Sequence, residues 1–251
     1  MSIPQVFLAA GWSGGALPLS ASEVHHLRDV RRVRSAEQLV VVMPDGERVL
    51  ARITSVGPKG ISAEPETRLG ELWAPRVILV QGIAKGARMD IAIEKATELG
   101  VHAIIPLLSA RTVVKLDAAG AERKRERWQR LAASAAKQSM QSSVPVVEPV
   151  ARPADLGARL AEADHVFVFD ASEDALSVRE AFRRCGVTPD DEVAVVVGAE
   201  GGLEDFEIAA LCEAGAVKVG LGPTVLRTET AGAVAVALVA YEMGGLGNSR
   251  A

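Results

Sequence analysis

The chain changes its pattern of apolar and polar residues near residue 75. Before that point the apolar runs are short, rich in β-branched residues and separated by turn signals, which is typical of a small β domain. After it, buried β runs alternate with stretches of helical spacing, which predicts a parallel sheet covered by helices on both faces. The pattern therefore predicts two domains, one over 1–70 and one over 74–246.

The first domain is predicted to be mostly β. Asp45 and Gly46 tolerate the backbone angles of a tight hairpin turn. Ser20 and Glu23 have capping-box spacing and begin a short helix. Strands are expected at residues 5–8, 39–43, 48–53 and 61–63. These elements form a small barrel or sheet, and the polar stretch 67–75, which contains glycine and proline, is expected to be the linker.

The second domain reads as a series of strands and helices. Strands are predicted at 77–80, 103–107, 144–147, 166–169, 192–197 and 217–219, and helices at 87–99, 118–138, 154–161, 175–184, 204–214 and 231–243. The strand at 144–147 contains Pro145, so we place it at an edge of the sheet. In such sheets the ligand crevice lies at the carboxyl ends of the strands.

Two glycine loops fall at such strand ends. Residues 198–202 follow one strand, and residues 220–222 follow the next. Glycine lets the backbone turn sharply and lets a flat ligand approach the main chain, so the loops are expected to form two walls of one crevice. A generic tight turn explains the first loop equally well. The chain lacks both the P-loop and the early dinucleotide-binding glycine motif.

Composition excludes several classes of protein. The 251 residues are 49% hydrophobic and include two cysteines far from any CxxC spacing, so neither a disulfide framework nor a zinc site is indicated. The four histidines are scattered, and we expect no metal. No basic start, signal peptide or membrane-length apolar run is present, which makes a cytoplasmic protein the expectation.

Basic residues are concentrated in two places although the net charge is −4. Residues 111–137 contain eight Lys and Arg against three acids, and residues 28–34 contain four Arg against one Asp. Such patches on an acidic chain suit local binding of a polyanion. The alternative is a solvated helix face, because residues 123–130 are also good helix-forming sequence.

Several motifs together resemble the ribosomal RNA small subunit methyltransferase E family of the SPOUT class. They are Lys85-Gly86-Ala87-Arg88-Met89-Asp90, residues 94–101, Gly198-Ala199-Glu200-Gly201-Gly202 and residues 221–231, of which Leu226-Arg227-Thr228-Glu229-Thr230-Ala231 is the most specific. His25-His26-Leu27 with Val30-Arg31-Arg32 is similar to the family's N-terminal domain. The resemblance implies an α/β protein: a small PUA-like β-barrel for RNA recognition, followed by a parallel-sheet methyltransferase domain with a C-terminal trefoil knot. It also implies a homodimer that uses S-adenosylmethionine to methylate N3 of a uridine in the 16S rRNA of the small ribosomal subunit.

The expected site residues follow from these motifs and from the reaction. Cofactor binding is assigned to Gly198, Glu200, Gly201, Gly202, Leu221, Gly222, Leu226 and Thr228, and RNA binding to His26, Arg31, Arg32 and Arg111. Uracil N3 must lose a proton, so the reaction needs a base and a cation, and Glu229 and Arg227 are the candidates. The alternative is that the run around Glu229 only caps a helix. Glu200 is interpreted as a hydrogen-bond acceptor that stabilises its loop.

Other functions stay open at this stage. The chain has Gln5 where the resembled family usually has an arginine, and Met140-Gln141 in a run that usually ends in Gly-Arg, two positions expected to face RNA. The alternatives are a non-catalytic RNA-binding or ribosome-assembly protein, a SPOUT methyltransferase acting on a different nucleotide, and a nucleotide-dependent metabolic enzyme. Ribose 2′-O methylation is disfavoured because the asparagine motifs of that branch are absent.

Overall fold

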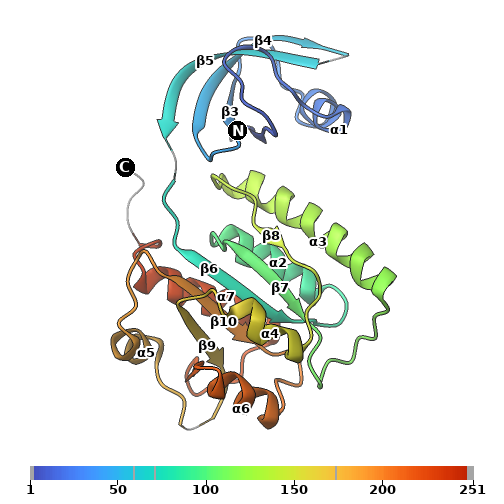
Figure 1. Cartoon of the computed structure of the whole chain (residues 1–251). Coiled ribbons are helices and arrows are strands. Elements are labelled where there is room, and N and C mark those ends of the chain that lie inside the picture. The colour runs from blue at the N-terminus through green and yellow to red at the C-terminus, as the bar shows by residue number, and fades with distance from the viewer. Residues whose placement is uncertain (1–2, 59, 71, 173, 248–251) are drawn as a thin grey trace. The chain divides into compact units, whose positions relative to one another are not determined.

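The computed structural model describes residues 3–58, 60–70, 72–172 and 174–247, which form two compact units (Figure 1). One unit comprises Met1–Leu72 with Ala136–Ser143, and the other comprises Trp73–Ala135 with Val144–Ala251. No helix among the described residues is both long and apolar enough to cross a membrane. The first unit is therefore completed by a segment from the middle of the chain.

The first unit is built on a five-stranded sheet of order β1-β3-β4-β5-β2. Its elements are β1 (Gln5–Phe7), β2 (Gly15–Ala16), α1 (Ala21–His25), the π-helical turn η1 (His26–Val30), β3 (Gln38–Val42), β4 (Arg48–Gly57) and β5 (Gly60–Gly70). Alternate apolar residues of the long strands, such as Leu39, Ile53 and Ile61, are fully buried in one core. The predicted hairpin is confirmed as β3 and β4.

Two expectations at the ends of this unit have different outcomes. The capping box is confirmed, because the Ser20 hydroxyl accepts from the Glu23 N–H at 3.3 Å and the Glu23 carboxylate accepts from the Ser20 N–H at 3.1 Å. The linker expected over 67–75 is wrong in its first part, since β5 extends to Gly70 and stays paired with β4. Within the expected linker, the described residues that lack regular structure are 72–75.

The segment Ala136–Ser143 belongs to the first unit through specific contacts. The Gln5 side chain donates from Nε2 to the carbonyl of Gln141 at 2.7 Å, and Lys137 pairs with Glu23 at 2.9 Å. Gln5 is only 6% exposed. The expectation that Gln5 faces RNA is therefore wrong: the two positions at which the sequence departs from the resembled family are hydrogen-bonded to each other instead.

The second unit is a six-stranded parallel sheet of order β11-β9-β10-β6-β7-β8. Its elements are β6 (Arg76–Gly82), α2 (Arg88–Glu98), β7 (Ala103–Leu107), α3 (Ala118–Ser139), β8 (Val146–Val147), α4 (Pro153–Leu160), β9 (His165–Phe169), α5 (Val178–Cys185), β10 (Glu192–Val197), α6 (Asp205–Glu213), β11 (Val217–Val219) and α7 (Thr228–Glu242), where the last turn of α3 belongs to the first unit. The predicted strands are confirmed, except that the strand expected at 144–147 covers only Val146–Val147; its edge position is confirmed.

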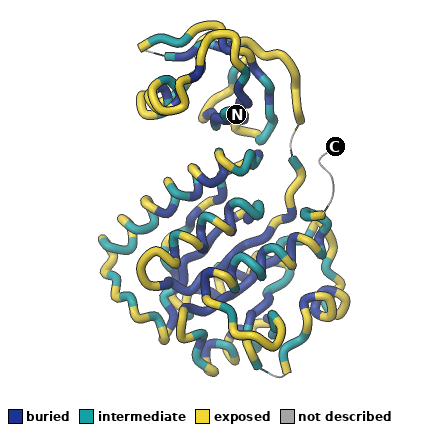
Figure 2. Tube along the Cα trace, turned by 180° about the vertical axis from the view of Figure 1, so that it is seen from behind, coloured by how far each residue is buried: buried dark blue, intermediate teal, exposed yellow. Residues whose placement is uncertain are grey.

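Helices cover both faces of this sheet. Leu79 of β6 packs in a core with residues of α2, α3, α5 and α7, whereas its neighbour Val80 packs in a second core with α4 and α6. Successive strand side chains point to opposite faces, so each strand contributes to both cores. The strands are accordingly the most buried part of the unit, as Figure 2 shows in dark blue.

Two predicted helix starts are corrected. The helix expected from residue 175 begins at Val178, because Leu176 bridges to Val219 and Ser177 serves as the N-cap. The helix expected from residue 231 begins at Thr228. The earlier start brings the Thr228 side chain onto the first turn of α7, where it makes the contacts described below.

Candidate cofactor site

A hollow of about 400 Å³ lies at the carboxyl edge of the parallel sheet. Its walls come from the segments that follow β9, β10 and β11, together with the first turn of α7. Among the lining residues are Asp170 after β9, Gly198 after β10 and Leu221 after β11. The volume falls within the ~300–1,000 Å³ typical of small-molecule sites.

The first glycine loop is packed too closely for side chains. A Cβ on Gly198 would lie 2.5 Å from the carbonyl carbon of Gly202, and one on Gly82 would lie 2.1 Å from the nitrogen of Ala199. Gly202 also has a φ of +73°, which L side chains rarely adopt. These glycines therefore allow the loop after β10 to fold against the end of β6.

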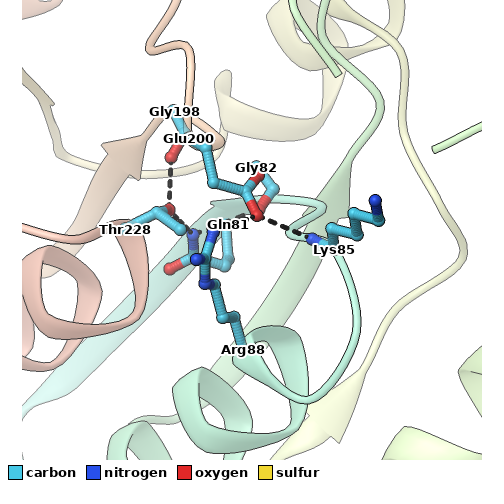
Figure 3. Close-up of polar contacts among 7 residues, drawn as sticks. All are labelled: Gln81, Gly82, Lys85, Arg88, Gly198, Glu200 and Thr228. Carbon is cyan, nitrogen blue, oxygen red and sulfur yellow. Dashed lines mark hydrogen bonds and ion pairs between the residues drawn. The ribbon is translucent and has the colours of Figure 1, made fainter. Parts of the chain in front are cut away.

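Glu200 fastens this loop to the segment after β6 (Figure 3). Its Oε1 accepts from the Lys85 N–H at 2.9 Å and pairs with Nη1 of Arg88 at 3.0 Å. Partial burial alone would raise the pKa of Glu200, but the hydrogen bonds from Lys85 and Arg88 outweigh it and hold that pKa below its usual value. The interpretation of Glu200 as a loop-stabilising acceptor is confirmed.

A buried chain of hydrogen bonds joins three segments behind the hollow (Figure 3). The Thr228 hydroxyl donates its single proton to the Gly198 carbonyl at 2.6 Å, so it must accept from Nε2 of Gln81 at 2.8 Å. The same Nε2 donates to the carbonyl of Gly82 at 3.1 Å. Gln81 and Thr228 are almost fully buried, so this chain ties β6, the loop after β10 and α7 together.

The first turn of α7 carries both residues proposed for catalysis. Arg227 occupies the N-cap position, where it is exposed and makes no side-chain cap. Glu229 is buried at 9% exposure, and its Oε2 has no hydrogen-bond partner among the described residues. Both residues line the hollow. A solvated cap does not describe Glu229, because a buried carboxylate oxygen without a partner is costly unless a ligand supplies a donor.

The structure brings most of the expected cofactor residues together. Those lining the hollow are Gly198, Glu200, Gly202, Leu221, Gly222, Leu226 and Thr228. Gly201 does not line it and faces Arg111, whose Nη1 donates to the Gly201 carbonyl at 2.9 Å while its Nη2 pairs with Glu204 at 2.8 Å. Arg111, expected at the RNA, is thus held against the glycine loop. The other expected RNA contacts, His26, Arg31 and Arg32, are exposed in the first unit.

Three residues of the site were not predicted from the sequence. Arg88 and Asp170 line the hollow, and Gln81 supports it from behind. Asp170 directly follows a predicted strand at the carboxyl edge, and Gln81 is a polar residue inside an apolar run; these were the available signals. Among the described residues, no group of three His, Cys, Asp or Glu side chains is arranged to hold a metal ion.

Comparison with known proteins gives consistent matches. The family model for the RNA methyltransferase domain matches residues 72–240, and that for the RNA methyltransferase PUA domain matches residues 19–66. Ribosomal RNA small subunit methyltransferase E of Bacillus subtilis is 34% identical over 229 residues, covering 89% of each chain. The protein of the same name from Mycobacterium bovis is 37% identical over 236 residues, covering 90% of this chain and 87% of its own. The crystal structure of the Neisseria gonorrhoeae enzyme of that name, bound to S-adenosyl methionine, superimposes with a TM-score of 0.83 at 29% identity and covers 95% of this chain and 97% of its own.

Proposed function

Because this chain belongs to the ribosomal RNA small subunit methyltransferase E family, we propose that it uses S-adenosylmethionine to methylate N3 of a uridine in the 16S rRNA of the small ribosomal subunit. The observation that carries the proposal is the hollow at the carboxyl edge of the sheet, where a buried, unpartnered oxygen of Glu229 lines a site walled by two glycine loops. The fold alone would not identify the reaction.

The residues of the hollow fit this cofactor. Gly198, Gly202 and Gly222 line the hollow, and because glycine has no Cβ, the adenosine of the cofactor can approach the main chain of both loops closely. The cofactor carries positive charge on its sulfonium and its amino group, and Asp170 and Glu229 supply carboxylates in the lining. We assign cofactor binding to the two loops and Thr228, whose hydroxyl also holds the first loop in position.

Glu229 and Arg227 carry out the proton chemistry in this proposal. S-adenosylmethionine supplies a methyl group on a sulfonium sulfur whose positive charge disappears on transfer. Glu229 accepts the proton from uracil N3, and the N3 electron pair then forms the new bond to the methyl carbon as its bond to sulfur breaks. Arg227 stabilises the negative charge that develops on the neighbouring uracil carbonyls, and the N-terminus of α7 adds its dipole.

The finer architecture belongs to the same proposal. We infer that the segment leading into α7 threads through the loop after β10 as a trefoil knot; the Thr228 bond to Gly198 and the contact between Gly232 and Gln81 support this path. We infer also that residues 1–70 curve into a PUA-like barrel that recognises RNA through His26, Arg31 and Arg32, exposed side chains at the start of η1 and directly after it.

We infer a homodimer from the surface of α7. One side of this helix packs into the core through Ala235, Val236 and Val239. The other side exposes Leu238 and Tyr241, at 38% and 55%. We propose that a second copy covers this apolar stripe, because a helix that is apolar on all sides favours burial on both. A Leu238→Glu variant is then expected to elute as a monomer in size-exclusion chromatography with light scattering.

Transfer of labelled methyl from S-adenosylmethionine to small subunits that lack N3-methyluridine tests the reaction. The digested 16S rRNA should yield N3-methyluridine by mass spectrometry. A Glu229→Gln variant should lose about 10²–10⁴ in kcat, as expected when a general base is removed. Its affinity for S-adenosylmethionine, measured by calorimetry, should change far less, because glutamine preserves the size of the side chain.

Two outcomes would count against the assignment. Methyl transfer to another position or another RNA would support the methyltransferase activity but contradict the assignment of uridine N3 in 16S rRNA as its target. Tight cofactor binding without transfer to any RNA would favour the non-catalytic RNA-binding alternative.

A further inference from the structure

The basic segment between Arg111 and Lys137 is only partly neutralised by ion pairs. Its paired members are Arg111 with Glu204, Arg125 with Glu122, Arg127 with Asp90 and Lys137 with Glu23. Lys124 lies over the ring of Trp128 at 5.5 Å. Lys115, Arg123 and Arg130 form no ion pair within the part of the chain that the structure describes. Ion pairs therefore neutralise four of the eight cations of this segment.

Two of these unpaired cations, Lys115 and Arg123, line two adjoining hollows. Lys115 and Arg123 line a hollow of about 380 Å³ at the start of α3. Lys115 also lines a neighbouring hollow of about 420 Å³, together with Arg152 and Phe206. Arg152 is exposed and forms no ion pair with any described residue, and Phe206 is 65% exposed on the first turn of α6. An exposed aromatic ring thus lines the same hollow as Lys115 and Arg152, on a helix turn that also carries Asp205 and Glu207.

Both hollows lie at the same edge of the sheet as the cofactor site. The segment from Leu108 to Leu116 follows β7, Arg152 follows β8, and Phe206 follows the glycine loop after β10. This segment is fastened to that loop and to α6, because Arg111 donates to the Gly201 carbonyl and the Ala110 N–H donates to Glu207 at 2.9 Å. A polymer bound in the hollows would therefore pass beside the site of methyl transfer.

We propose that the two hollows form one binding surface for an unpaired stretch of RNA, with phosphates against Lys115, Arg123 and Arg152 and one base stacked on Phe206. That the bound polyanion is RNA rests on the function proposed above. Cations bind the backbone of any nucleic acid, whereas an exposed aromatic ring selects unpaired strands, whose bases are free to stack on it. None of these four residues is among those assigned above to cofactor or RNA binding.

The test measures binding of a uridine-containing single-stranded RNA oligonucleotide to the full chain by fluorescence anisotropy at several salt concentrations. The double variant Lys115→Ala/Arg123→Ala should reduce the slope of log affinity against log salt by about 1.4, at ~0.7 for each phosphate that the variant no longer neutralises. The matched control Arg183→Ala/Arg184→Ala removes two exposed cations of α5, outside both hollows, and should leave the slope unchanged. Phe206→Ala should weaken binding roughly tenfold, and Phe206→Trp should restore it.

The outcomes separate this surface from the proposed reaction. Absence of binding by the unmodified chain, equal slopes for the two double variants, or tighter binding of a duplex of the same sequence would refute the surface. A Phe206→Ala variant that changes the oligomeric state but not the RNA affinity would also refute it and assign the ring to a protein interface. If binding follows the expected pattern while no RNA is methylated, the surface stands and the proposed reaction fails.

Discussion

Replacing Thr228 by valine should loosen the cofactor site from behind. The change keeps the shape of the side chain and removes the hydroxyl, so the Gly198 carbonyl loses its donor and Gln81 Nε2 loses one of its two acceptors. A buried polar group left without a partner costs about 1–3 kcal/mol. Because Gln81 keeps its bond to Gly82, only the Gly198 carbonyl is left without a partner, and we expect a loss of about 1–3 kcal/mol in the free energy of unfolding.

Urea unfolding followed by Trp128 fluorescence measures this loss. Trp128 is buried in the core of the second unit at 1% exposure, and a Trp12→Phe/Trp73→Phe background makes it the sole reporter. Thr228→Ser retains the hydroxyl and is the control. In the double variant with Gln81→Leu both partners are apolar, so its loss should be smaller than the sum of the single losses by about 1–2 kcal/mol.

Additivity would refute the reasoning. If the losses of Thr228→Val and Gln81→Leu sum to that of the double variant within about 0.5 kcal/mol, the two side chains do not share a hydrogen bond in solution. A serine variant as unstable as the valine variant would show that packing of the Thr228 methyl group, and not the hydroxyl, stabilises this region.

Three further changes test other contacts of the site. Glu200 has a pKa below its ordinary 4.5 in the folded chain, so its contribution to stability is complete above that value and is lost as the pH falls through the folded pKa. Urea unfolding across pH should therefore show that Glu200→Gln is less stable than the unmodified chain at pH 7. In acid the free energies of unfolding of the two proteins should become equal. Gly232→Ala would bring a Cβ to 2.3 Å from Gln81 Oε1, and this overpacking should cost ~1–3 kcal/mol, more than the gain of about 1 kcal/mol in helix propensity. The variant should therefore unfold at a lower temperature than the unmodified chain. In a Gln81→Ala background the clash is absent, and the same change should raise the temperature of thermal unfolding. Arg111→Ala releases the glycine loop and should raise the Kd for S-adenosylmethionine severalfold in calorimetry, whereas Arg179→Ala, which breaks an exposed ion pair on α5, should not.

Periodicity was sufficient to predict the strands and helices of the second unit and the edge of the sheet at which the hollow lies. Apolar runs and glycine positions are local properties, and β10 and β11 begin and end where the sequence indicates. The start of α7 was missed because Thr228 is helical through a bond to Gly198, 30 residues away, rather than through a capping side chain. Propensity carries no information about such a contact.

The role of Gln81 and the burial of Gln5 have the same origin. Gln81 bonds to Thr228 across 147 residues, and Gln5 bonds to Gln141 across 136. A single sequence shows that Gln81 is a polar residue in an apolar run, but it does not show which groups form hydrogen bonds with its side chain. Likewise, the resemblance indicated an exposed RNA contact at Gln5, whereas the segment that ends α3 covers this side chain.

The short edge strands of the parallel sheet limit how copies of this chain can meet. β8 has two residues, directly after Pro145, and β11 has three. A neighbouring chain that extends a sheet needs a long row of free backbone N–H and C=O groups, and such short edges offer few. Cross-β aggregation through this unit is therefore disfavoured, and the proposed contact between copies through the helix α7 is compatible with these short edges.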